Sequence, residues 1–172
     1  LGRRNQVHVF RLDGRISLVT EVEAFEQGLQ GAANRGPLLI LVEFDAYETR
    51  PVFARRMAQA LMEIDYCRTV CYIPGGKYKG AFKELAIVAI AGDELYMHPA
   101  TRIGGASAIA ATTGDKDEVD GLLGVQSVSQ EQLEDWQNFV MSLAELQDKP
   151  EPIVAAMVDD SIKLVRVTNE SG

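Results

Sequence analysis

The pattern of hydrophobic and polar positions along the chain predicts strands that alternate with helices. Two short, almost continuous apolar runs, 37–44 (PLLILVEF) and 69–73 (TVCYI), are typical of strands that are covered on both faces. Apolar residues at helical spacing predict one helix from a capping box at Thr20 to a stop at Gly36, and a second over 51–64. Because strands joined by helices pair in parallel through right-handed crossovers, we expect an α/β fold with a mostly parallel sheet.

Weaker patterns surround this central part. Residues 7–11 (VHVFR) have the pattern of a strand. A turn pattern follows at 13–14, and 16–19 have the pattern of a second extended segment. Together these patterns predict a hairpin-like start. A third helix is predicted over 80–90; nearly all of it is small and apolar, so we expect it to be buried. A short strand over 95–97 follows it.

In the last third of the chain, the regular alternation of strand and helix patterns stops. Residues 108–127 contain several charges and glycines and have no apolar period, so we expect a surface loop. Residues 129–147 carry apolar side chains on one side of a helix, with a capping box at Ser129. A short helix over 152–157 and a terminal strand over 162–167 complete the predicted elements.

The acidic balance of the chain excludes one class of partner. Asp and Glu (25) outnumber Lys and Arg (17), and the formal net charge is −8. Nucleic-acid binding needs the opposite balance, so we expect no nucleic acid as a partner. The 172 residues, 47% of them hydrophobic, fit one globular domain over 1–172, and a start at Leu1 suggests a piece excised from a longer chain. No apolar run reaches the length of a membrane span, so we expect membrane contact only through segments outside this piece.

The sequence contains few residues that could bind a metal ion. Cys67 and Cys71 have no Cys or His partners at ligand spacing, and His8 and His98 are the only histidines, which leaves too few ligands for zinc. We interpret the cysteines as small, semi-buried hydrophobic residues. A disulfide between them is unsupported, because a strand places such a pair about 13 Å apart. We expect no metal and no cofactor.

Three loops lie at the predicted carboxyl ends of the strands, where open α/β sheets bind ligands. They are 45–50, 74–80 and 100–107. The middle loop (PGGKYKG) is rich in glycine and leads into a helix N-terminus, whose unpaired backbone N–H groups favour an anion or a developing oxyanion. It lacks the spacings of phosphate-binding loops, and most loops of this kind are only turns.

Two long segments are similar to a known family. VHVFRLDGRISLVTEVEAFEQGLQGAANRGPLLILVEFD at 7–45 and TVCYIPGGKYKGAFKELAIVAIAGDELYMHPATRIGGASAI at 69–109 resemble the ClpP/crotonase superfamily and, within it, the NfeD-type membrane-bound serine proteases. The resemblance covers most of the chain, and 93–107 is its most specific part. It implies a spiral of stacked β/α units that self-associates as a dimer or a larger assembly. It also implies a site where a serine attacks a peptide carbonyl, with a lysine as base and glycine amides as oxyanion hole. The location it suggests is membrane-associated or extracytoplasmic, in a bacterium or archaeon.

The residue that should carry this chemistry is missing. The nucleophile position of the family corresponds to Ala81, Phe82 or Lys83, none of which is a serine. The sequence has no serine at all between Ser17 and Ser107. Lys83 is a poor substitute, because a protonated amine is not a nucleophile.

Two further parts of the family's machinery are absent as well. The region that corresponds to the catalytic lysine, 130–134, contains no lysine, and the loop that donates an oxyanion amide reads DAYETR at 45–50, without glycine. We still expect the remaining loop residues to line the cleft. These residues are Asp45, Gly75, Gly76, Gly80, Gly104 and Gly105.

We therefore predict a serine-protease-like domain that has lost its catalytic residues and acts as a structural, peptide-binding or protein-interaction module. Its candidate contact surface is the helix over 129–147, with Trp136 and Phe139, and the alternative is that this helix packs on its own chain. Two other functions stay open. One is an active serine endopeptidase with a non-standard nucleophile such as Ser107, and the other is a crotonase-like enzyme that binds acyl-CoA. The lack of a Lys and Arg cluster for nucleotide phosphates counts against the second.

Overall fold

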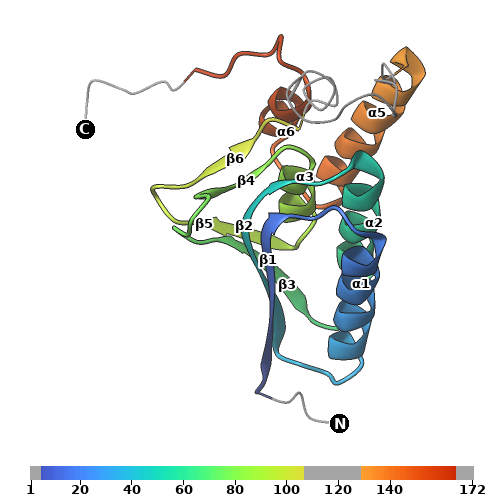
Figure 1. Ribbon diagram of the computed structural model, residues 1–172, viewed down its shortest axis with the longest axis vertical. Coiled ribbons are helices and arrows are strands. Elements are labelled where there is room, and N and C mark those ends of the chain that lie inside the picture. The colour runs from blue at the N-terminus through green and yellow to red at the C-terminus, as the bar shows by residue number, and fades with distance from the viewer. Residues whose placement is uncertain (1–4, 107–128, 166–172) are drawn as a thin grey trace, which may run out of the picture.

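The computed structural model describes residues 5–106 and 129–165, in which strands and helices alternate along the chain (Figure 1). The first five elements are β1 (Val7–Arg15), α1 (Val19–Ala33), β2 (Leu39–Glu48), α2 (Pro51–Met62) and β3 (Arg68–Ile73). They are followed by β4 (Gly80–Phe82), α3 (Glu84–Ile90), β5 (Glu94–Met97), β6 (Arg102–Gly104), α5 (Gln130–Leu146) and α6 (Glu151–Val158).

β2 is the centre of the sheet. β1 pairs along one side of it, whereas β3 and β4 share the other side: β3 pairs with the first half of β2, and β4 pairs near its end, where Ala81 lies opposite Ala46. β5 continues the sheet beyond β3, and β6 continues it beyond β4. Every pairing among the described strands is parallel, which confirms the predicted α/β class. The carboxyl ends of β1, β2 and β4 therefore lie at one edge.

The hydrophobic core lies between one face of this sheet and the helices. Ile40, Val42 and Phe44 of β2 are fully buried, and they alternate with side chains that are only half-buried. α3 is buried along its whole length, as its small apolar residues predict. Truncation of a buried side chain of the size of Phe44 costs about 3–5 kcal/mol, so this alternation strongly determines which face of β2 meets the helices.

The α5 helix packs on its own chain. Trp136 is 3% exposed, and its indole N–H donates to the carbonyl of Ala106 at 3.0 Å. Val140 and Leu143 are also buried on this side of the helix. The expectation that Trp136 forms part of a contact surface is therefore wrong, and the alternative that the helix covers its own core is confirmed. Its predicted cap is also confirmed, because the Ser129 hydroxyl accepts from the backbone N–H of Gln132.

The predicted hairpin-like start is wrong. β1 runs without a turn from Val7 to Arg15, and all of it pairs in parallel with β2. Gly14 does have a left-handed backbone, with φ of 71°, but it sits beside a shift in the strand register and not in a turn. A glycine inside a strand pattern often marks such an irregularity. The first helix then begins at Val19, and the Glu21 carboxylate, not Thr20, accepts the N–H groups of Ser17 and Leu18.

Three further boundaries differ from the prediction. β2 continues to Glu48, so most of the expected 45–50 loop is strand. The expected helix over 80–90 is divided into the short strand β4 and the helix α3, because 80–82 find a partner strand in β2. The terminal strand is absent over 162–165, where the described chain forms neither strand nor helix. The predicted loop over 108–127 and residues 166–167 lie outside the described residues.

Candidate functional site

The candidate site is the sharp turn, or elbow, between β4 and α3, and Lys83 is its central residue. Lys83 has φ of 53° and ψ of −139°, a backbone conformation that non-glycine residues rarely adopt. Its backbone N–H donates to the carbonyl of Gly104 at 3.0 Å, which ties the elbow to β6. Serine hydrolases of a different fold place their nucleophile on a strained strand-to-helix turn of the same kind. A strained non-glycine residue held in this way is a sign of a functional position.

The Lys83 side chain forms an ion pair with the end of β2. Its Nζ lies 2.9 Å from Oε1 of Glu48, and the other carboxylate oxygen of Glu48 lies 3.3 Å from Nε of Arg15 at the end of β1. The Lys83 and Glu48 side chains are both about one-third exposed, at 32% and 28%. The sheet thus brings together one residue from the predicted nucleophile stretch and one from the predicted oxyanion loop.

Glu84, the first residue of α3, is a buried acid without a hydrogen-bond partner from any other residue. It is 1% exposed, and neither carboxylate oxygen accepts a hydrogen bond from another residue in the part of the chain that the structure describes. Burial raises the pKa of Glu84 to about 7, and the charge of Glu48 adds to the rise while its own backbone N–H and Lys83 oppose it. Near neutral pH this carboxyl group is therefore partly protonated.

The glycine-rich loop before β4 closes on Asp45. The Asp45 carboxylate accepts the backbone N–H groups of Lys77, Tyr78 and Lys79 at 2.6, 2.8 and 2.9 Å. Gly76 is required for this approach, because a Cβ there would overlap the Asp45 carboxylate. The N–H groups predicted to attract an external anion are thus occupied by a carboxylate of the same chain.

The other predicted glycines serve close packing around the elbow. A Cβ on Gly80 would press against the carbonyl of Arg102 at 2.6 Å, so the two adjacent strands approach only because residue 80 has no side chain. Gly104 and Gly105 have φ of 133° and 73° and turn the chain after β6. Gly75 lies against the His98 ring, where a Cβ would be 3.2 Å from Nδ1.

The structure brings together most, but not all, of the predicted site residues. Ala81 and Phe82 lie in β4 directly before the elbow, and Ala81 is fully buried. Ser107 lies outside the described residues. Sequence reasoning missed Glu84, although a single acid at the start of an otherwise apolar helix was a usable signal. It included Glu48 only as part of a loop, because nothing local indicates its pairing with Lys83.

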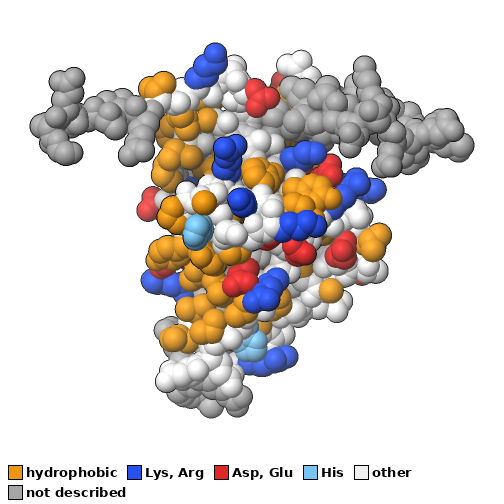
Figure 2. All heavy atoms as spheres, turned by 60° about the vertical axis from the view of Figure 1, so that its left-hand side comes forward, with side chains coloured by type: hydrophobic (Ala, Val, Ile, Leu, Met, Phe, Trp, Pro, Cys, Tyr) orange, Lys and Arg blue, Asp and Glu red, His pale blue; other side chains and the backbone are white. Residues whose placement is uncertain are grey.

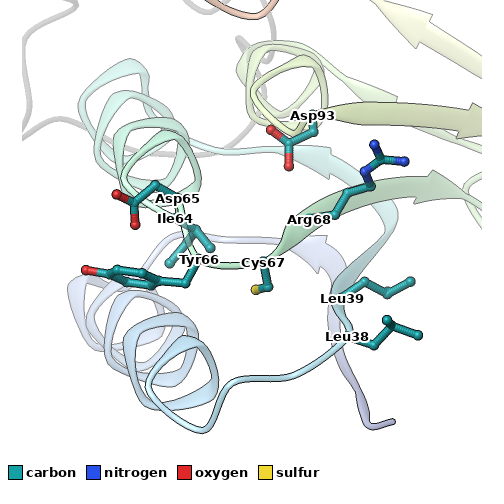
Figure 3. Close-up of a pocket in the computed structure, with 8 residues that line it drawn as sticks. All are labelled: Leu38, Leu39, Ile64, Asp65, Tyr66, Cys67, Arg68 and Asp93. Carbon is teal, nitrogen blue, oxygen red and sulfur yellow. The ribbon is translucent and has the colours of Figure 1, made fainter. Parts of the chain in front are cut away.

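A surface hollow of about 680 Å³ lies away from the elbow and is shown in Figure 3. It is at the other edge of the sheet, near the amino-terminal ends of β2 and β3. Asp93 lines it, but the Asp93 carboxylate already accepts the N–H and the hydroxyl of Thr69 at 2.7 and 3.0 Å. Arg68, which also lines it, pairs with Glu94. The Asp93 and Arg68 side chains are thus already paired within the fold. Its remaining lining is Leu38, Leu39, Ile64, Asp65, Tyr66 and Cys67.

The described residues offer neither a cluster of metal ligands nor a helix that could span a membrane. No group of three or more His, Cys, Asp and Glu side chains within 5–106 and 129–165 is arranged to hold a metal ion. Among the helices of the same two segments, none is long and apolar enough to cross a membrane. Cys67 and Cys71 are both buried thiols.

Comparison with known proteins shows similarity at the level of structure. No protein-family model and no curated protein matches the sequence. The fold is similar to a serine-to-alanine variant of the 1510-N membrane-bound stomatin-specific protease, with a TM-score of 0.73 and 17% identity over 94% of this chain and 72% of that chain. The 1510-N membrane protease specific for a stomatin homolog from Pyrococcus horikoshii gives a TM-score of 0.64 and 16% identity over 90% and 63%. The ClpP protease catalytic domain from Plasmodium falciparum gives 0.54 and 7% over 87% and 72%.

The chain therefore has the fold of the ClpP-like serine proteases. Within that class, the similar structures include the membrane-bound type to which the sequence resemblance points. Identities of 17% and below establish the fold and not the activity.

Proposed function

We propose that this chain is a serine-protease-like domain without the protease's nucleophile, and that it binds a peptide or protein instead of cleaving one. The observation that carries the proposal is the ion pair between Lys83 and Glu48 at the elbow. In the sequence resemblance, Lys83 belongs to the stretch that corresponds to the nucleophile, and Glu48 belongs to the loop that donates an oxyanion amide. A paired ammonium and carboxylate stand where the protease chemistry needs a hydroxyl and an N–H donor.

The electrostatics of the elbow argue against acyl transfer. A protease stabilises the negative charge that develops on the carbonyl oxygen with preorganised N–H donors. At this elbow the Glu48 carboxylate already forms ion pairs with Lys83 and Arg15. Glu84, a second acid, directly follows Lys83 in the chain. The two cations that could stabilise an oxyanion here are therefore already paired with a carboxylate.

The loop before β4 supports the same proposal. Its N–H groups at Lys77, Tyr78 and Lys79 donate to Asp45, so they are not available to a substrate carbonyl. Next to this contact, the rings of Tyr47 and Tyr78 pack together with their centroids 4.9 Å apart. Because these N–H groups are already used, we propose that the domain binds its ligand without cleaving it. A peptide is the ligand we propose, since a solved structure of similar fold, a lysine-to-alanine variant of the stomatin-specific protease, is in complex with a substrate peptide.

Intact-mass spectrometry after exposure to a fluorophosphonate probe tests the loss of a serine nucleophile. The full chain is incubated beside trypsin as a positive control, and Ser107→Ala serves as the matched variant. We expect no adduct on the chain and a complete one on trypsin. A stoichiometric adduct that disappears in Ser107→Ala would overturn the proposal and identify the nucleophile.

Two further measurements complete the test. The full chain is incubated with a library of apolar peptides, and cleavage is followed by mass spectrometry, where we expect intact peptides. A crotonase-like enzyme would instead be stabilised by a CoA thioester, because a ligand that binds only the folded state raises the melting temperature. We expect no shift with the thioester, and a clear concentration-dependent shift would favour the acyl-CoA function over ours.

A further inference from the structure

A small pocket lies where α2 begins, between that helix and α5. Its volume is about 330 Å³, which is at the lower end of the range for sites that bind small ligands. Pro51, Val52 and the aliphatic stems of two arginines give it an apolar wall, and Val52 is 63% exposed there. Trp136 borders the pocket but is only 3% exposed, so most of its ring belongs to the core.

One cation of this pocket has no anion. Arg55 and Asp135 both line the pocket and form an ion pair with each other at 2.6 Å. Arg50 also lines it, and none of the acids within 5–106 and 129–165 forms an ion pair with Arg50. The lining thus has an excess of one positive charge, in a chain whose net charge is −8. A cation beside apolar surface favours a ligand with a single negative charge.

Aromatic rings hold the guanidinium groups of both arginines. Cζ of Arg50 lies 5.6 Å from the centre of the Phe53 ring, and Cζ of Arg55 lies 4.7 Å from that of Phe139. A guanidinium held in one plane by such a contact can bind a carboxylate through two parallel hydrogen bonds. The first turn of α2 contains no acid that would compete for the Arg50 guanidinium. A carboxylate is therefore the ligand group that suits Arg50.

Exposed apolar surface alone does not distinguish this pocket from the rest of the molecule. Figure 2 shows a face on which hydrophobic side chains gather in a broad band, with charged side chains of both signs among them. The pocket at α2 differs because its apolar wall adjoins Arg50, a cation that no acid of the described segments neutralises. Together these features select a ligand in which an apolar group lies next to one negative charge.

The C-terminal residue of a peptide combines these two groups, because its side chain and its carboxylate share one Cα atom. Gln132 and Asp135 border the same pocket with an amide and a carboxylate, which can bond to the N–H and C=O of the preceding peptide group. A fatty acid also joins an apolar group to a carboxylate, but it has no N–H for Asp135. A phosphate group carries close to two negative charges, more than Arg50 alone can balance.

We propose that this pocket binds the C-terminal residue of a peptide, with its apolar side chain against Val52 and its carboxylate on Arg50. This rests on the proposed function and deepens it, because it names the part of a peptide that the domain recognises. The two proposals can fail separately. Cleavage of peptides or a fluorophosphonate adduct would overturn the first, whereas peptide binding that ignores the C-terminal carboxylate would overturn only the second.

The test uses Trp136 as its reporter. Trp136 is the only tryptophan of the chain and borders the pocket, so its fluorescence responds to a ligand bound there. The full chain is immobilised and used to select binders from a library of short random peptides with free C-terminal carboxylates. The selected peptides are then titrated against the chain in solution, each as the free acid and as the C-terminal amide. Decanoate, which has an apolar chain and a carboxylate but no peptide group, is the comparison ligand.

Two variants locate the contact, and each has a matched control. Arg50→Gln removes the charge, and Arg35→Gln makes the same change at an exposed arginine after α1 that forms no ion pair with the described residues. Val52→Glu places a carboxylate in the apolar wall. Val19→Glu does the same at a 45% exposed valine in the first turn of α1. Circular dichroism melts verify that each variant is folded.

We expect the selected peptides to end in an apolar residue and to bind about tenfold more tightly as acids than as amides, since a hydrogen bond to a charged group is lost in the amide. Arg50→Gln should abolish this difference, and Val52→Glu should weaken binding of the acid by about tenfold or more. Arg35→Gln and Val19→Glu should bind as the unmodified chain does.

Four results would each overturn the proposal. They are equal binding of acid and amide, a preference for the acid that persists in folded Arg50→Gln, a control variant that binds as weakly as its partner, and tighter binding of decanoate than of every selected peptide. A selection that yields no peptide at all would overturn both this proposal and the proposed function.

Discussion

Nζ of Lys83 lies 2.9 Å from Oε1 of Glu48, although the two residues are 35 positions apart in the sequence. The contact joins the elbow between β4 and α3 to the end of the central strand. It forms because β2 and β4 are parallel neighbours, so that the ends of both strands reach the same edge of the sheet. Two predicted departures from the protease pattern, far apart in the sequence, thus meet in one ion pair.

The backbone of Lys83 leads to the first prediction. A positive φ costs a non-glycine residue about 1 kcal/mol, which glycine does not lose. Lys83→Ala and Lys83→Gly both remove the ion pair, which at this exposure contributes only about 0.2–1 kcal/mol. We therefore expect Lys83→Gly to be more stable than Lys83→Ala by about 1 kcal/mol in urea unfolding.

The same two substitutions at Lys77 provide the control. Lys77 lies in the loop before β4 but is not among the non-glycine residues with positive φ. There we expect the alanine variant to be the more stable one, because glycine gains entropy in the unfolded chain. The same order of stability at both positions would contradict a strained backbone at Lys83.

The buried Glu84 carboxyl predicts a fall of stability with rising pH. Its pKa in the folded state, about 7, lies above the ordinary value of 4.5, so the folded state holds the proton more tightly than the unfolded state. The free energy of unfolding is therefore unaffected by this group below about pH 4.5, decreases as the pH rises towards 7, and levels off above it. The total loss is about 3 kcal/mol.

Glu84→Gln removes this titration and keeps the shape of the side chain. We expect the difference in unfolding free energy between the variant and the unmodified chain to move in favour of the variant from pH 5 to pH 8. Glu63→Gln, at an exposed position after α2, should show no such trend. Parallel pH profiles for the unmodified chain and Glu84→Gln would mean that the carboxyl is not buried as described.

The contacts of Asp45 predict how the loop before β4 responds to its loss. Asp45→Asn keeps one acceptor oxygen but replaces the other by an N–H₂ group, which cannot accept the N–H of the loop. We expect a loss of about 2 kcal/mol, the usual size for hydrogen bonds to a charged group. Amide hydrogen exchange should become faster at Lys77, Tyr78 and Lys79 while the core of β2 stays protected.

Asp13→Asn is the matched control for this prediction. Asp13 lies opposite Asp45 in the strand register, but its side chain is exposed on β1. We expect its substitution to leave both the stability and the exchange of the loop unchanged. Equal effects at the two positions would point to a general loss of negative charge at this edge of the sheet.

Local patterns were sufficient for most elements. The apolar run at 69–73 and the helical spacing over 51–64 correspond to β3 and α2 within one or two residues. The Ser129 cap was found because the hydroxyl and Gln132 lie three residues apart and act on the same turn. Such signals are carried by neighbouring residues, so no knowledge of the rest of the chain is needed.

The elements that were missed depend on residues far away in the sequence. β4 has three residues and is a strand only because β2 and β6 pair with it. Gly14 has the sequence pattern of a turn, and only the pairing of β1 with β2 makes it part of a strand. Residues 129–147 were identified as amphipathic, but the pattern has no information on whether the apolar side meets its own chain or another.

Taken alone, the order of residues determines the α/β class, the main helices and buried strands, and the absence of serine from the predicted nucleophile stretch. All of these follow from the identity and short-range spacing of side chains. The pairing of Lys83 with Glu48 and the burial of Glu84 were decided by the tertiary structure. They require knowing which strands are neighbours and which face the helices cover, and those relations arise only when distant segments pack to bury a common core.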